Sequence, residues 1–149
     1  PPRIDVDRFM GAWYVVAGIF TPFERCAHNA VEFYVRDGDG SIETRYRFRL
    51  GAFDGPYLEL RSRAFVEDPA SGSRWGMQFV PPFRADYRIL QVDAGYRFTI
   101  VGREARDLVW IMSRTPELSD LRLGRALSFL DRIGYDIDRV RRVPHRWSR

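Results

Sequence analysis

The 149-residue chain has one cysteine, two histidines and no lysine. A lone cysteine, Cys26, excludes a disulfide within the chain. His28 and His145 are far apart in sequence, and no acid–histidine–nucleophile set, metal-ligand spacing or phosphate-binding loop accompanies them. No apolar run approaches the roughly 20 residues that a membrane-spanning helix needs. We therefore expect no cofactor, no metal and no transmembrane helix.

Positive charge comes from arginine alone, with 24 arginines against 20 acidic residues and a formal net charge of +4. The arginines are scattered among acidic residues rather than gathered in blocks, so they do not indicate a nucleic-acid partner. The densest group is C-terminal and comprises Arg139, Arg141, Arg142, Arg146 and Arg149. A solvated tail explains this group, and contact with anionic lipid headgroups at a membrane surface is the alternative.

Composition and length fit one globular domain over residues 1–149. The hydrophobic fraction is 45% and the charged fraction 30%, both ordinary for a globular protein. The chain begins Pro-Pro-Arg, which leaves open whether a signal segment preceded it.

Short runs of alternating apolar and polar residues, separated by turn residues, dominate the chain. The expected strands are residues 13–20, 28–36, 41–49, 57–67, 74–80, 87–91, 96–100 and 108–112. Alternation is clearest in the third run, where Ile42, Thr44, Tyr46 and Phe48 share one face and charged residues the other. Such regular spacing is typical of an antiparallel sandwich or barrel.

The period changes to that of a helix after the eighth strand. Ser119 is a plausible N-cap, Asp120 suits the first turn, and Gly134 suits the C-terminal end. Apolar residues recur at helical spacing at Leu123, Ala126, Leu127, Leu130 and Ile133. A short run at 139–143 can add a final edge strand.

Eight strands joined by short turns can close into a barrel, which removes exposed edges.

Two motifs resemble those of the lipocalin family. Gly11-Ala12-Trp13 resembles the family's first motif, in which Gly11 permits a tight entry to the first strand and Trp13 plugs the closed end. Arg114, at the end of the eighth strand, matches the arginine that stacks over this tryptophan. The resemblance implies an all-β fold: an eight-stranded up-and-down antiparallel β-barrel with one C-terminal α-helix packed outside.

Three further segments, at 21–25, 82–87 and 107–116, are similar to the bacterial branch of the family, the outer-membrane lipoproteins related to apolipoprotein D. The middle lipocalin motif is degraded, because Gly95 stands where an acidic residue is usual. The resemblance covers about residues 4–145. It implies binding of a fatty acid or lysophospholipid, and a role in envelope lipid maintenance. Many members carry a lipid on an N-terminal cysteine, and Cys26 lies too late in the chain to be that anchor.

A barrel interior either is filled by side chains or holds one small ligand. Periodicity alone favours a solid core, whereas the resemblance favours a cavity. The expected ligand-binding residues are Val31, Phe33, Tyr46, Phe48, Met77, Phe79, Tyr87, Ile89, Phe98, Trp110 and Met112. Tyr87 and Trp110 each offer an apolar body with one polar atom, which suits an amphiphile. Arg25, Arg61 and Arg74 are candidates for a charged headgroup.

Other functions stay open. An enzyme of the same fold could act on a lipid or isoprenoid through Cys26, with His28 two residues away, or through a cavity tyrosine. His28 could also serve a haem-binding lipocalin. A solid barrel could instead act through its surface, for example as a homodimer. The protein is expected in the bacterial cell envelope if a signal segment was removed, and in the cytoplasm otherwise.

Overall fold

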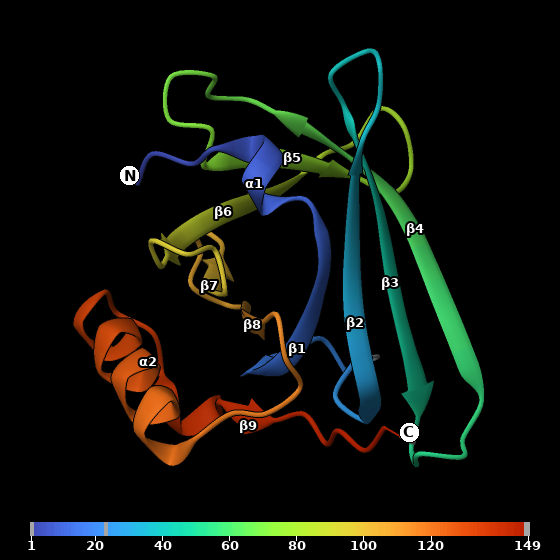
Figure 1. Cartoon of the computed structure of the whole chain (residues 1–149), viewed down its shortest axis with the longest axis vertical. Coiled ribbons are helices and arrows are strands. Elements are labelled where there is room, and N and C mark those ends of the chain that lie inside the picture. The colour runs from blue at the N-terminus through green and yellow to red at the C-terminus, as the bar shows by residue number, and fades with distance from the viewer. Residues whose placement is uncertain (1, 23, 148–149) are drawn as a thin grey trace.

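The computed structural model describes residues 2–22 and 24–147, and it confirms the closed antiparallel barrel (Figure 1). The strands are β1 (Gly11–Ile19), β2 (Ala27–Arg36), β3 (Ile42–Leu50), β4 (Tyr57–Val66), β5 (Arg74–Gln78), β6 (Ala85–Val92), β7 (Phe98–Gly102), β8 (Val109–Ser113) and β9 (Arg141–Arg142). Consecutive strands from β1 to β8 are antiparallel neighbours, and β1 also pairs with β8. This last pairing closes the barrel, and β9 adds a short ninth strand on β1.

A four-residue helix, α1 (Val6–Phe9), lies at one end of the barrel (Figure 1). Asp5 caps it by accepting from the backbone N–H groups of Asp7 and Arg8. The helix brings Phe9 onto Trp13, with ring centroids 5.0 Å apart, and onto Trp75 at 5.5 Å. These three rings are fully buried and close this end of the barrel.

The helix α2 (Asp120–Arg132) packs on the outside, followed by the 3₁₀ turn η1 (Ile137–Arg139). Ser119 caps α2 as expected, accepting from the backbone N–H of Arg122 at 3.1 Å. Leu130 and Ala126 are buried in a second hydrophobic cluster with outward-facing residues of β7 and β8. None of the helices formed by the described residues has the length and hydrophobicity to cross a membrane.

Phe98 belongs to this outer cluster, so its expected place in the cavity is wrong. The guanidinium of Arg122, on α2, lies 4.7 Å from the centre of the Phe98 ring. The alternation of β7 identifies which residues share a face, but every residue of β7 is buried because α2 covers the outer face. Sequence alternation therefore could not distinguish the inner face from the outer one.

The two faces of β2 are also the reverse of the expected ones. Phe33 lies on the outside, where the guanidinium of Arg47 stacks 4.7 Å from the centre of its ring. Val31 lies on the same outer face and pairs with Arg47 of β3 and with Tyr14 of β1. Glu32 faces the interior in its place. Assigning the more apolar set to the interior fails here because an outward arginine, Arg47, covers the ring of Phe33 with its guanidinium.

Two of the C-terminal arginines, Arg142 and Arg146, contact the rest of the protein. Arg142 pairs with Asp120, Nη2 to Oδ1 at 2.6 Å, and Arg146 lies 4.4 Å from the centre of the Phe53 ring. The backbone N–H of Arg146 also donates to the side chain of Asn29 at 2.8 Å. Arg149 lies outside the described residues. The segment through Trp147 thus runs along the barrel rather than extending as a free tail.

Candidate ligand-binding cavity

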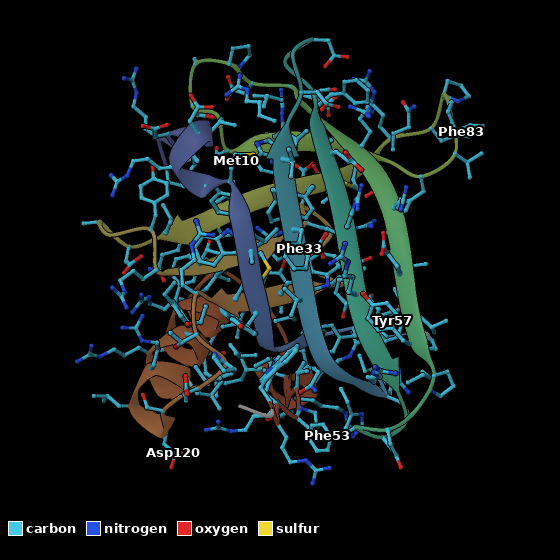
Figure 2. All side chains as sticks on the ribbon, turned by 45° about the vertical axis from the view of Figure 1, so that its right-hand side comes forward. Met10, Phe33, Phe53, Tyr57, Phe83 and Asp120 are labelled. Atoms are coloured by element: carbon cyan, nitrogen blue, oxygen red, sulfur yellow. The ribbon has the colours of Figure 1, made fainter. Side chains whose placement is uncertain are left out.

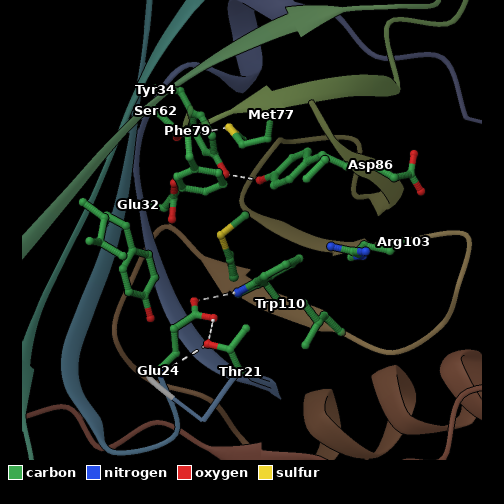
Figure 3. A pocket seen from close by; sticks show the side chains of 16 residues that line it. Thr21, Glu24, Glu32, Tyr34, Ser62, Met77, Phe79, Asp86, Arg103 and Trp110 are labelled. Carbon is green, nitrogen blue, oxygen red and sulfur yellow. Dashed lines mark hydrogen bonds between the residues drawn. The ribbon is translucent and has the colours of Figure 1, made fainter. Parts of the chain in front are cut away.

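A cavity of about 260 Å³ occupies the barrel between the aromatic plug and the opposite end (Figure 3). Its inner wall is mostly apolar and comes from six strands. The lining side chains are Tyr34, Tyr46, Met77, Tyr87, Trp110 and Met112, with Thr21, Glu24, Glu32, Ser62, Asp86 and Arg103 as polar members and Leu60, Phe79, Ala85 and Leu108 completing the wall. The barrel is therefore hollow at this end and solid at the other.

The cavity brings together six of the eleven expected ligand-binding residues, namely Tyr46, Met77, Phe79, Tyr87, Trp110 and Met112. Phe48 and Ile89 also lie within the inner hydrophobic cluster, but they are not part of this wall. Val31, Phe33 and Phe98 lie outside the barrel, as described above. That the six lining residues contact a ligand stays a prediction.

Exposed apolar residues mark the rim, at the loop between β5 and β6. Phe79, Val80 and Phe83 are 58%, 67% and 76% exposed. Phe83 lies at the projecting end of this loop (Figure 2). Phe79 contributes to the cavity wall, so the loop joins the interior to the outer surface at this point.

Three rings form a stacked column along one side of the interior. Trp75 and Tyr87 lie 5.4 Å apart at an interplanar angle of 14°, and Tyr87 and Trp110 lie 6.0 Å apart at 26°. The hydroxyl groups of Tyr87 and Tyr34 share a hydrogen bond. The column gives the cavity an aromatic wall in which the Tyr87 hydroxyl has a hydrogen-bond partner.

Three carboxyl groups line the cavity, and none of them was predicted from the sequence. Asp86 is ion-paired with Arg88, which leaves Glu24 and Glu32. Glu24 accepts from Thr21 Oγ1 at 3.0 Å and from Trp110 Nε1 at 3.3 Å (Figure 3). Glu32 has no hydrogen-bond or ion-pair partner among the described residues. Burial raises the pKa of the Glu32 carboxyl well above its usual range, and the charge of Glu24 adds to the effect.

Two buried polar atoms of the lining, the Tyr46 hydroxyl oxygen and Arg103 Nε, have no hydrogen-bond partner within the described part of the chain. Tyr46 is 6% exposed, and its ring lies 5.1 Å from that of Phe48. Burial raises the pKa of the Tyr46 hydroxyl well above its usual value, with smaller contributions from Glu24 and Glu32. A buried hydroxyl without a hydrogen bond is costly, so a ligand that supplies one gains affinity.

The expected headgroup arginines do not line the cavity. Arg61 pairs with Glu59 on the barrel exterior, Nε to Oε1 at 3.0 Å, while Arg25 and Arg74 are exposed. The one arginine in the lining is Arg103, whose Nε lies 3.1 Å from Asp107 Oδ1. The cavity therefore presents carboxylates rather than cations, which reverses the expected electrostatics.

Arg114 and Trp13 form a layered closure at the plugged end. The Arg114 guanidinium lies 3.7 Å from the centre of the Trp13 ring, and Trp13 Nε1 donates to the Phe9 carbonyl at 2.8 Å. Gly11 has a φ of +99°, and a Cβ there would meet Arg114 Nη1 at 3.4 Å. The glycine thus allows both the left-handed backbone and the close approach of the arginine.

Cys26 is exposed and does not belong to the cavity lining. His28 Nδ1 lies 3.0 Å from the backbone carbonyl oxygen of Cys26, rather than contacting its sulfur. The His28 ring packs against Phe53, 5.0 Å between centroids. Neither residue is placed to act on, or coordinate, a molecule held inside the barrel.

A comparison with protein families matches residues 4–145 to the lipocalin-like domain. The chain belongs to the lipocalin family. The outer membrane lipoprotein Blc of Escherichia coli K12 is 27% identical over 146 residues, covering 93% of this chain and 82% of that protein. Temperature-induced lipocalin-1 of Arabidopsis thaliana is 28% identical over 156 residues, covering 95% and 79%. The similarity to Blc supports the bacterial branch of the lipocalins that the motifs indicated.

Solved structures confirm the lipocalin fold. Lobster apocrustacyanin A1 superposes with a TM-score of 0.73 at 16% identity, covering 96% of this chain and 81% of that one. Insecticyanin from the tobacco hornworm Manduca sexta gives a TM-score of 0.70 at 15% identity, covering 99% and 82%. Family membership supports binding of a small hydrophobic ligand as the role of this lipocalin's cavity.

Proposed function

We propose that this lipocalin binds and carries a single-chain lipid, a fatty acid or lysophospholipid, with the acyl chain inside the barrel, and that it does not transform the lipid. The observation that carries the proposal is the hollow itself. It is walled by aromatic and methionine side chains, plugged at one end by Trp13 and Trp75, and reached past Phe79 at the other.

The size of the cavity favours one chain over two. At about 260 Å³ it lies just below the range of roughly 300–1,000 Å³ typical of small-molecule sites. Each methylene group that leaves water for this wall contributes about 0.8 kcal/mol. Met77 and Met112, whose unbranched side chains adapt to irregular shapes, suit a flexible chain of this kind.

We further propose a cell-envelope location and a role in maintaining envelope lipids. The support is the similarity over most of the chain to proteins named as outer membrane lipoproteins in Escherichia coli and Citrobacter freundii.

Titration with a fluorescent fatty acid and a fluorescent lysophospholipid tests the proposal. We expect saturable binding in the micromolar range or tighter. Trp110→Arg places a charge in the cavity wall and is expected to weaken binding by about tenfold or more. Val35→Arg is the matched control, because Val35 is 55% exposed on the outer face of β2 and its substitution should leave binding unchanged.

Two results would contradict this function. Absence of saturable binding by the wild-type protein, with circular dichroism showing a folded barrel, would remove the carrier role. Chemical conversion of the bound lipid during long incubation, read by mass spectrometry, would replace it with the enzymatic alternative. In that case Cys26→Ala and Tyr87→Phe would separate the thiol from the cavity tyrosines.

A further inference from the structure

The interior of the barrel contains an acceptor pair that the protein does not satisfy. Glu32 of β2 and Tyr46 of β3 are directly opposite each other in the antiparallel register, and both line the cavity. Their Cβ atoms are consequently roughly 5 Å apart. No hydrogen bond or ion pair joins the Glu32 carboxyl or the Tyr46 hydroxyl to another group within residues 2–22 and 24–147, and of the two groups the Tyr46 hydroxyl is the one closed off from solvent.

The groups that surround this pair do not supply a cation. The titratable side chains in the lining are Glu24 from the β1–β2 loop, Glu32 and Tyr34 from β2, Tyr46 from β3, Asp86 and Tyr87 from β6, and Arg103 after β7. Arg103 is ion-paired with Asp107, and Asp86 with Arg88. Glu24 is held by Thr21 and Trp110. The unmatched charge inside the barrel is therefore negative.

We propose that the preferred ligand is a hydrophobic amine, whose protonated nitrogen lies between the Glu32 carboxylate and the Tyr46 hydroxyl while its apolar chain fills the rest of the cavity. An ammonium group has three N–H donors and no acceptor, which complements two unsatisfied oxygens. The contact with Glu32 is a charge-assisted hydrogen bond in a low-dielectric site. Trp110, which ends the stacked column and lines the cavity, adds an aromatic ring that attracts a cation.

This inference rests on the proposed function, and it ranks the amphiphiles that the cavity accepts. A fatty-acid anion would add a third carboxylate beside Glu24 and Glu32, which like-charge repulsion opposes. A neutral alcohol avoids this repulsion, but it lacks the positive charge with which an amine pairs with Glu32. At neutral pH the expected order of affinity for one chain length is therefore amine, then alcohol, then carboxylate.

Isothermal titration calorimetry with decylamine, decanol and decanoate at pH 7 tests the ranking. We expect decylamine to bind about tenfold more tightly than decanol, and decanoate to bind most weakly. Glu32→Gln should abolish the preference for decylamine, and Tyr46→Phe should reduce it while keeping the ring. Glu43→Gln is the matched control, because Glu43 pairs with Arg45 outside the barrel, and it should keep the wild-type order.

The pH dependence gives a second readout that needs no variant. Because the Glu32 pKa is raised, its charge is lost as the pH falls through that raised value, so decylamine binding should weaken as the pH is lowered. Decanoate binding should strengthen as the pH is lowered. Glu32→Gln should flatten both responses.

Decanoate binding at pH 7 as tightly as decylamine would overturn the inference, as would an amine preference that survives Glu32→Gln. If the lysophospholipid titration succeeds and no amine preference exists, only this inference fails. If the lysophospholipid, fatty-acid and decyl compounds all fail to bind, the proposed function fails with it.

Discussion

Single residues hold the plugged end together, and Arg114 contributes most to it. Its guanidinium lies over Trp13 and donates to the carbonyls of Ala12 at 2.9 Å, Tyr96 at 3.0 Å and Arg8 at 3.0 Å. Lysine cannot reproduce this planar fork of donors. One side chain thus joins α1, the start of β1 and the β6–β7 turn.

Arg114→Met is expected to lower the free energy of unfolding by about 2–3 kcal/mol, because it removes charged hydrogen bonds and leaves carbonyls unsatisfied. Arg114→Lys should recover less than half of this loss. Urea unfolding followed by tryptophan fluorescence measures both. If the Arg114→Met variant were as stable as the wild type, the stacking of Arg114 on Trp13 would contribute nothing to stability.

The Glu32 carboxyl inside the barrel predicts a pH-dependent stability. Its pKa is raised in the folded state, so the folded protein binds this proton more tightly than the unfolded chain does. The resulting stabilisation is complete below the usual glutamate value of 4.5 and is lost as the pH rises through the raised value.

Glu32→Gln removes the titrating carboxyl group, so the stability of the variant should not fall as the pH rises. The variant should therefore be more stable than the wild type at pH 7. The two proteins should converge below the usual glutamate pKa. Thermal unfolding at a series of pH values measures the difference. A variant that is less stable at neutral pH would indicate that the charge of Glu32 is compensated within the folded protein.

The sequence could predict the motif residues but not the polarity of the cavity. Trp13 and Arg114 were identifiable because a short motif requires each of them. Glu32 was not, because a charged residue between Val31 and Phe33 reads as an outward position. The structure reverses the strand faces there, since Arg47 covers Phe33 on the outside and the cavity admits a carboxyl group.

Among the elements, α2 contributes to stability without taking part in the cavity. Leu130 is fully buried in the cluster between this helix and the outer faces of β7 and β8. Leu130→Ala is expected to cost about 2–4 kcal/mol in unfolding free energy, from lost burial and a residual cavity. Leu121→Ala is the control, because Leu121 is 67% exposed and its loss should change stability by less than about 0.5 kcal/mol.

Ligand affinity of Leu130→Ala should equal that of the wild type, because the outer cluster and the cavity lie on opposite faces of the sheet. Chemical unfolding and ligand titration on the same preparation separate the two effects. A large fall in affinity without unfolding would mean that the helix shapes the cavity, contrary to this description.

Eight strands and the long helix were predictable from hydrophobic periodicity and turn residues. The run at 139–143 contains the short strand β9. The helix α1 was not expected, because four residues are too few to show a period. The inner and outer faces of β7 could not be assigned either, because α2 buries the outer face of that strand as fully as the barrel buries the inner one.

The whole molecule is divided into two unlike halves. One half of the barrel is filled by rings that pack on Trp13, and the other half is hollow, with Glu32 and Tyr46 in its wall. A closed sheet makes this division possible, because its inward side chains can be large at one end and spaced around a ligand at the other.

Whether the barrel is hollow enough to hold a lipid can be measured by native mass spectrometry of the intact chain, after incubation with an equal mixture of single-chain lipids and decylamine. We expect one bound single-chain molecule per protein chain, and its loss in Trp110→Arg but not in Val35→Arg. A folded wild-type chain that carries no added mass at any lipid concentration below micelle formation would contradict it.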